Sequence, residues 1–154
     1  MGFSKEYVAQ CSSLKIIQYN RFVQTPLMWA CMFTHKDVAE FLLTNVPECI
    51  HSYDCYGRTA LIYALCCGNT EIASLLLNAY EIQNTDISLH DKRSNSINKF
   101  DREGNNALCY AAARGDMPLV TQFLRAGAYP TAKAIKLAAE HGHKELVVNF
   151  SFNE

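Results

Sequence analysis

The stretch DCYGRTALIYALCCGNTEIASLLL, residues 54–77, carries the pattern that decides the fold. A small polar residue, Thr59, is followed by an apolar run, a glycine (Gly68) and a second apolar run. A threonine side chain accepts a hydrogen bond from the free amides of a helix's first turn, and glycine ends helices because it adopts the left-handed conformation. The stretch therefore predicts two short helices joined by a tight turn.

The same pattern returns elsewhere along the chain. TPLMWACMFTHKDVAEFLL begins at Thr25, NALCYAAARGDMPLVTQFL begins at Asn106, and a weaker copy, KAIKLAAEHGHKELVV, is aligned from Lys133. The residues that punctuate these copies are the predicted N-caps Thr25, Thr59 and Asn106, Pro26 at a first helical position, and the helix-ending glycines Gly115 and Gly142. Helices this short are marginal alone, so the pattern indicates units that stack and bury their shared faces.

The opening of each copy resembles the ankyrin repeat. Its motif DxxGxTxL is present as DCYGRTAL at 54–61 and as DREGNNAL at 101–108, and TPL begins at Thr25. The resemblance covers about residues 20–150 and implies an all-α solenoid of about four helix-turn-helix units with projecting β-turn fingers. Two features depart from the family. The TPLH histidine is replaced by Met28, Ile62 and Cys109, and the spacing between copies is uneven.

We divide the chain into one ankyrin-repeat domain with the following expected segments. They are an N-terminal cap (1–19), repeat 1 (20–53), repeat 2 (54–80), an inserted loop (81–100), repeat 3 (101–130) and a degenerate C-terminal capping repeat (131–154). Residues 3–12 are expected to form a helix that covers the open end of repeat 1. The inserted loop is polar, and both a recognition role and a role as a solvated spacer stay open.

The overall composition narrows the class of protein. Hydrophobic residues make up 49% and charged residues 19%, which is typical of a globular domain, and the net charge of −1 offers no basic face for nucleic acid. The sequence has no apolar run long enough for a membrane helix and no signal peptide at its start. Seven cysteines without a pairing pattern favour reduced thiols. We therefore expect a monomeric cytoplasmic protein that uses neither nucleic acid nor membrane as a partner.

The cysteine and histidine residues do not form a recognised catalytic or metal-binding motif. The adjacent pair Cys66 and Cys67 is not matched by any CxxC, and the five histidines are scattered. We interpret the cysteines as packing or exposed thiols and predict a non-enzyme without cofactor or metal. The aromatic residues Trp29, Tyr63 and Tyr110 recur at one repeat position, and we expect them to form a ladder in the core instead of a platform for bases.

The resemblance also indicates a binding surface, because ankyrin arrays bind proteins through their finger tips and the inner face of their first helices. The matching tip residues are Arg21, Phe22, Gln24, Cys55, Tyr56, Arg58, Arg102, Glu103 and Asn105. The matching inner-face residues are Met32, Phe33, Cys66, Cys67, Ala113, Arg114, Glu140 and His141. Aromatic residues, Met and Arg are enriched at interface centres, although Phe22 and Phe33 could instead pack under the N-terminal segment.

These observations predict a non-catalytic module that binds another protein through its concave surface. Two other classes stay open at this point. One is a metal- or thiol-based activity in the Cys66 and Cys67 region. The other is a structural or targeting segment of a larger assembly, of the kind that pathogen effectors use to bind host proteins.

Overall fold

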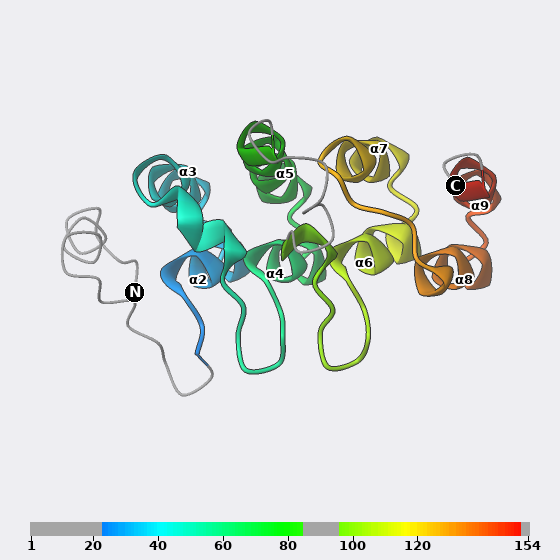
Figure 1. The fold of residues 1–154 in the computed structure, drawn as a ribbon, viewed down its shortest axis with the longest axis horizontal. Coiled ribbons are helices and arrows are strands. Elements are labelled where there is room, and N and C mark those ends of the chain that lie inside the picture. The colour runs from blue at the N-terminus through cyan, green and yellow to red at the C-terminus, as the bar shows by residue number, and fades with distance from the viewer. Residues whose placement is uncertain (1–22, 85–95, 152–154) are drawn as a thin grey trace.

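The helices of this chain lie in two layers that run the length of the molecule (Figure 1). The structure is a computed structural model that describes residues 23–84 and 96–151. The inner layer contains the first helix of each unit: α2 (Pro26–Met32), α4 (Ala60–Cys66), α6 (Ala107–Arg114) and α8 (Ala132–Glu140). The outer layer contains α3 (Lys36–Asn45), α5 (Thr70–Asn84), α7 (Met117–Arg125) and α9 (Lys144–Ser151). The all-α solenoid of helix pairs is thus confirmed.

Three of the inner helices, α2, α4 and α6, begin where their capping residues were predicted. The side-chain oxygens of Thr25, Thr59 and Asn106 accept hydrogen bonds from the backbone amides three residues further along, at Met28, Ile62 and Cys109. Pro26 occupies the start of α2, where its missing amide costs no helical hydrogen bond. The caps and the apolar runs together explain why these short segments form helices at the same place in each unit.

The turn between the two helices of a unit requires a left-handed residue. Gly115 ends α6 with φ of 73°, and Gly68 and Gly142 occupy the same place in their units with φ of 74° and 80°. The first unit has Thr34 at this place, and its φ is 62°. A β-branched residue pays a steric cost in that conformation, so this turn is strained where the other three are not.

The core lies between the two layers and is built from equivalent positions of the units. The alanines Ala30, Ala64, Ala111 and Ala138 and the aliphatic residues Leu27, Leu61 and Leu108 are all buried. Small residues on the inner helices allow neighbouring helices to approach closely, and the larger side chains of the outer helices fill the remaining space. Across 23–84 and 96–151, none of the helices combines the length and apolar character needed to cross a lipid bilayer.

Two fingers project beyond the inner layer, away from the outer helices (Figure 1). We call residues 53–59 finger 1 and residues 100–106 finger 2. The fingers are joined by a hydrogen bond of 2.9 Å from the Arg102 amide to the Tyr56 carbonyl. They approach so closely that a Cβ on Gly57 would lie 2.9 Å from the Phe100 carbonyl oxygen. Between α7 and α8 only residues 126–131 remain, and no finger forms there.

An ammonium group occupies the place of the missing third finger. Lys133, on α8, donates from Nζ to the Glu103 carbonyl at 2.6 Å. Glu103 is the finger 2 equivalent of Tyr56, so this hydrogen bond replaces the one that Arg102 makes between the fingers. The ladder of finger carbonyls therefore ends at a lysine side chain.

The structure differs from the sequence-based expectations in three places. α5 continues to Asn84, four residues into the stretch 81–100 that was expected to be a loop. α8 begins at Ala132 because Thr131 caps it, although the fourth copy was aligned from Lys133. The stretch 81–100 also contains a short helix, η2 (Ser96–Asn98), whose Ser96 hydroxyl lies 2.8 Å from His51 Nδ1. The expected capping helix at 3–12 lies outside the described residues.

Candidate functional site

Finger 1 is organised by one buried carboxylate, that of Asp54. Its Oδ1 accepts hydrogen bonds from the backbone amides of Tyr56 and Arg58, both at 2.8 Å. Its Oδ2 accepts the hydroxyl of Tyr63 at 2.7 Å, and Tyr63 in turn accepts from Gln24 at 2.6 Å. The carboxylate thus ties the finger to α4 and, through Gln24, to the preceding unit.

Finger 2 repeats this arrangement at Asp101. Its Oδ1 accepts from the backbone amides of Glu103 and Asn105, both at 2.9 Å. Its Oδ2 accepts the hydroxyl of Tyr110 at 2.7 Å, which is the same distance as in finger 1. The tyrosine follows the aspartate by nine residues in both fingers, so the two sites are structural copies of one another.

The two copies differ in the residue that follows the aspartate by four positions. In finger 1 this residue is Arg58, whose Nε and Nη2 both lie 3.1 Å from Asp54 Oδ2. In finger 2 it is Asn105, whose side-chain amide donates to Glu103 Oε2 at 3.4 Å. Asp54 is therefore neutralised within its own finger. No ion pair with Asp101 is found among the described residues.

Arginine and tyrosine side chains alternate along the fingers. The Arg58 guanidinium lies over the rings of Tyr56 and Tyr63, at 4.7 and 4.8 Å from their centroids. Arg102 also lies over the ring of Tyr56, at 5.5 Å from its centroid. Cation–π contacts of this kind hold long arginine side chains in place, so they limit the freedom of the groups that face the concave surface.

Burial and the hydrogen bond to Asp54 raise the pKa of Tyr63 to about 12. Burial and the hydrogen bond to Asp101 likewise raise the pKa of Tyr110 above its ordinary value. Both phenols therefore stay protonated at neutral pH. Each keeps the proton that it donates to its aspartate.

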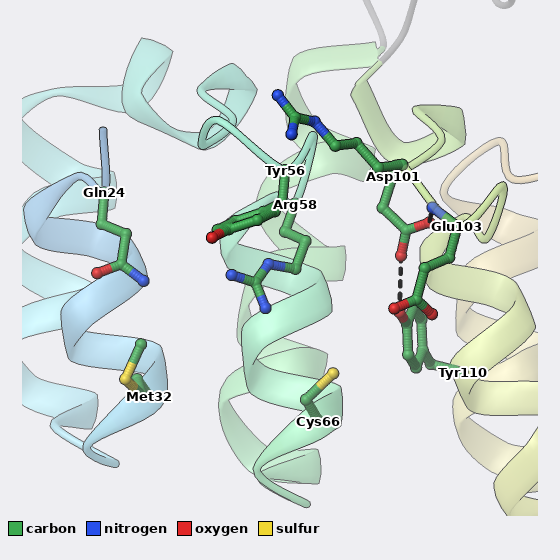
Figure 2. A pocket seen from close by; sticks show the side chains of 9 residues that line it. Gln24, Met32, Tyr56, Arg58, Cys66, Asp101, Glu103 and Tyr110 are labelled. Atoms are coloured by element: carbon green, nitrogen blue, oxygen red, sulfur yellow. Dashed lines mark hydrogen bonds between the residues drawn. The ribbon is translucent and has the colours of Figure 1, made fainter. Parts of the chain in front are cut away.

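A cavity of about 760 Å³ lies between the fingers and the inner helices. Figure 2 shows the side chains around it: Gln24 and Met32 come from the first unit, Arg58 and Tyr56 from finger 1, and Asp101, Glu103 and Tyr110 from the opposite side. The full lining is Gln24, Met32, Tyr56, Arg58, Cys66, Asp101, Arg102, Glu103 and Tyr110. Three consecutive units thus contribute to one concave site.

Seven of these lining residues belong to the surface that the sequence predicted: Gln24, Met32, Tyr56, Arg58, Cys66, Arg102 and Glu103. The structure brings them together from positions up to 79 residues apart in the chain, from Gln24 to Glu103. The sequence-based reasoning missed Asp101 and Tyr110. Their signal was present, because an aspartate is followed by a tyrosine at the same interval in two repeats.

The other predicted residues lie outside this cavity. Arg21 and Phe22 are outside the described residues. Phe33 is 52% exposed and stacks on Trp29 with 5.1 Å between ring centroids. The Arg114 guanidinium lies beside Gly68, and Cys55, Cys67 and Asn105 are not part of the lining. The remaining inner-face positions, Ala113, Glu140 and His141, are likewise absent from the cavity lining.

The expected core ladder of aromatic residues is only partly correct. Tyr63 is buried, but its hydroxyl serves finger 1, and Tyr110 is only half-buried. Trp29 is also half-buried and stacks on the exposed Phe33. The reason is that tyrosine has an apolar body and a polar tip, so it can pack against a helix while its hydroxyl binds a finger.

Cys66 is poorly suited to act as a nucleophile. Desolvation raises the pKa of the Cys66 thiol, and the neighbouring Cys67 acts in the same direction. A thiol with a raised pKa has less of the reactive thiolate at neutral pH. In the described ranges 23–84 and 96–151, no three residues of the type His, Cys, Asp or Glu come together in a way that could hold a metal ion.

Comparison with known protein families agrees with this architecture. A family model described as "Ankyrin repeats (3 copies)" matches residues 6–91, which is more than half of the chain. The chain belongs to the ankyrin-repeat family. A second model, described as "Ankyrin repeat", matches residues 103–135. A search of curated proteins found no significant match. Ankyrin repeats are generally protein–protein interaction modules, and the family is typically non-catalytic.

Proposed function

We propose that this protein is a non-catalytic binding module that holds a segment of another protein in the cavity between its fingers and inner helices. The observation that carries the proposal is the convergence of three units on one concave site lined by Tyr56, Arg58, Arg102 and Met32. Tyrosine, arginine and methionine are the residue types enriched at protein interfaces. Their presence in a cavity of about 760 Å³ supports the binding of side chains from a partner.

The geometry of the site favours a rigid receptor. The hydrogen bonds that Tyr63 and Tyr110 donate to Asp54 and Asp101 fix both fingers to the helices beneath them, and the finger-to-finger hydrogen bond fixes their spacing. A preorganised site loses less conformational entropy on binding than a mobile one. We infer that the partner adapts to the site and that the site itself changes little.

The six cysteines in the described part of the chain are free thiols, which supports a reducing compartment such as the cytoplasm. We propose a monomer there. The elevated pKa of Cys66 argues against the alternative of a thiol-based activity. A recognition role for the inserted loop, expected at 81–100, and the alternative of a targeting role in a larger assembly both stay predictions.

The test is affinity capture from a native lysate followed by mass spectrometry, with wild type compared with Tyr56→Ala. Tyr56 lines the cavity and is 38% exposed. Tyr53→Ala is the matched control, because Tyr53 lies on the same finger, is 51% exposed and is not part of the lining. We expect the partner to be lost with Tyr56→Ala, by at least about tenfold, and retained with Tyr53→Ala. Equal recovery with both variants would place the binding surface elsewhere.

A further inference from the structure

The two fingers contain the same carboxylate site, but only the site of finger 1 holds an arginine side chain. Asp54 binds the guanidinium of Arg58, which also lies over the ring of Tyr63. Asp101 has the same backbone amides and the same tyrosine hydroxyl, but its own finger supplies Asn105 where the arginine would be. Asp101 lines the cavity, whereas Asp54 does not.

A second carboxylate lies next to the Asp101 site. Glu103 also lines the cavity, and Figure 2 shows its carboxylate and that of Asp101 on the same side, near the hydroxyl of Tyr110. The Asp101 residue is only 8% exposed, so its charge is largely removed from solvent. Two nearby carboxylates, one of them buried and without a paired cation in the described residues, favour a positively charged group between them.

The cations around the cavity are engaged elsewhere. Arg58 is held by Asp54, and Arg102 lies over the ring of Tyr56 in finger 1. Lys133 donates to the backbone carbonyl of Glu103 and makes no ion pair with either carboxylate in the described structure. None of the three therefore fills the position at Asp101 that Arg58 fills at Asp54.

We propose that an arginine side chain of the bound partner enters the cavity and pairs with Asp101 and Glu103 against the ring of Tyr110. This inference rests on the proposed function and names the chemistry of the partner. The partner arginine completes finger 2 in the way that Arg58 completes finger 1. Arginine fits better than lysine because its planar guanidinium offers several donors in a fork and stacks on aromatic rings, as Arg58 does on Tyr63.

The test uses the isotope-labelled full chain and a small probe, N-acetyl-arginine methylamide, titrated by NMR at millimolar concentration. We expect shifts at the backbone amides of Glu103 and Asn105, because both donate to Asp101. The citrulline analogue has the same shape without the charge, and we expect no shift with it. Equal shifts from the two probes, no shift from arginine, or stronger binding of N-acetyl-glutamate methylamide would each overturn the proposal.

The decisive variant is Asn105→Arg, which supplies finger 2 with its own arginine. We expect it to lower the affinity for the probe by at least about tenfold, since a charge-assisted pair is displaced. Asn78→Arg adds the same charge at an exposed position of α5 and is expected to bind the probe normally. Glu103→Gln should weaken binding without removing an anchor of the finger.

The outcome separates this inference from the proposed function. If Tyr56→Ala loses the captured partner while Asn105→Arg keeps it, the cavity is the binding site but the partner arginine is wrong. If Asn105→Arg loses the partner together with the probe, and Asn78→Arg keeps both, the arginine site stands.

Discussion

Finger 1 and finger 2 have the same backbone hydrogen bonds and the same aspartate–tyrosine pair, but they handle the charge of the aspartate differently. Finger 1 neutralises Asp54 with Arg58, whose side chain is 34% exposed while that of Asp54 is fully buried. Finger 2 leaves Asp101 facing the cavity. One arrangement is complete in itself and serves the stability of the fold. The other leaves a buried charge without an ion pair among the described residues, and our proposal assigns this charge to partner recognition.

We expect the largest difference between the two fingers when each aspartate is replaced in turn. Asp54→Asn leaves Arg58 without its carboxylate and weakens the hydrogen bond from Tyr63, so we expect a loss of about 3 kcal/mol in the free energy of unfolding. Asp101→Asn strands no cation and should cost about 1.5 kcal/mol. Urea unfolding followed by circular dichroism measures both. Equal losses would mean that Arg58 contributes nothing to finger 1.

The glycines of the two fingers differ in how closely the backbone of the neighbouring finger approaches them. Gly57 and Gly104 have nearly the same φ, 76° and 74°, so alanine at either place carries the same conformational cost of about 1 kcal/mol. A Cβ at Gly57 would also press against the Phe100 carbonyl, whereas the nearest group at Gly104 is the flexible end of Lys133 at 3.7 Å. We expect Gly57→Ala to cost about 1 kcal/mol more than Gly104→Ala in the same unfolding assay.

The expected difference in stability between Gly57→Ala and Gly104→Ala depends on the close contact between Gly57 and Phe100 of finger 2. If the two alanine variants are equally stable, the fingers separate easily in solution, and the rigid spacing that we infer for the cavity is wrong.

Removing the hydroxyl of Tyr63, which binds Asp54 of finger 1, is expected to have the smallest effect on stability, and this effect depends on pH. The pKa of Tyr63 is raised from the ordinary value of 10.0 to about 12 in the folded protein. Its contribution to stability is therefore fully present below pH 10 and is lost as the pH rises toward about 12. We expect Tyr63→Phe to be about 1 kcal/mol less stable than wild type at neutral pH. The gap should narrow across that alkaline window, and a constant gap would contradict the assignment.

Much of the fold could be predicted because the signals are local. Thr25, Thr59 and Asn106 cap helices through their own side chains, and the glycines end them through their own backbones. The end of α5 at Asn84 and the start of α8 at Ala132 were less predictable. The predicted boundaries came from alignment to the other repeats. The end of α5 instead depends on tertiary packing of its last turn. The start of α8 depends on a cap at Thr131, which no other repeat has at that spacing.

The candidate site was only partly predictable for a different reason. Matching the family placed Tyr56, Arg58 and Glu103 on the finger tips without any knowledge of distances. Tyr110 was assigned to the core because periodicity records the side of the helix and not the direction of a hydroxyl group. The importance of Asp101 depends on a missing arginine. The sequence shows Asn105 where finger 1 has Arg58, but only the folded fingers show that Arg58 pairs with Asp54.

Lys133, which binds the last carbonyl group in the row of fingers, makes the two ends of that row different. An open row of carbonyl groups is a template on which further strands assemble, and positively charged side chains at such edges discourage polymerisation. Lys133 already occupies the carbonyl of Glu103 that another finger or a second molecule would need. The addition of another finger past finger 2 therefore requires the displacement of an ammonium group from the Glu103 carbonyl.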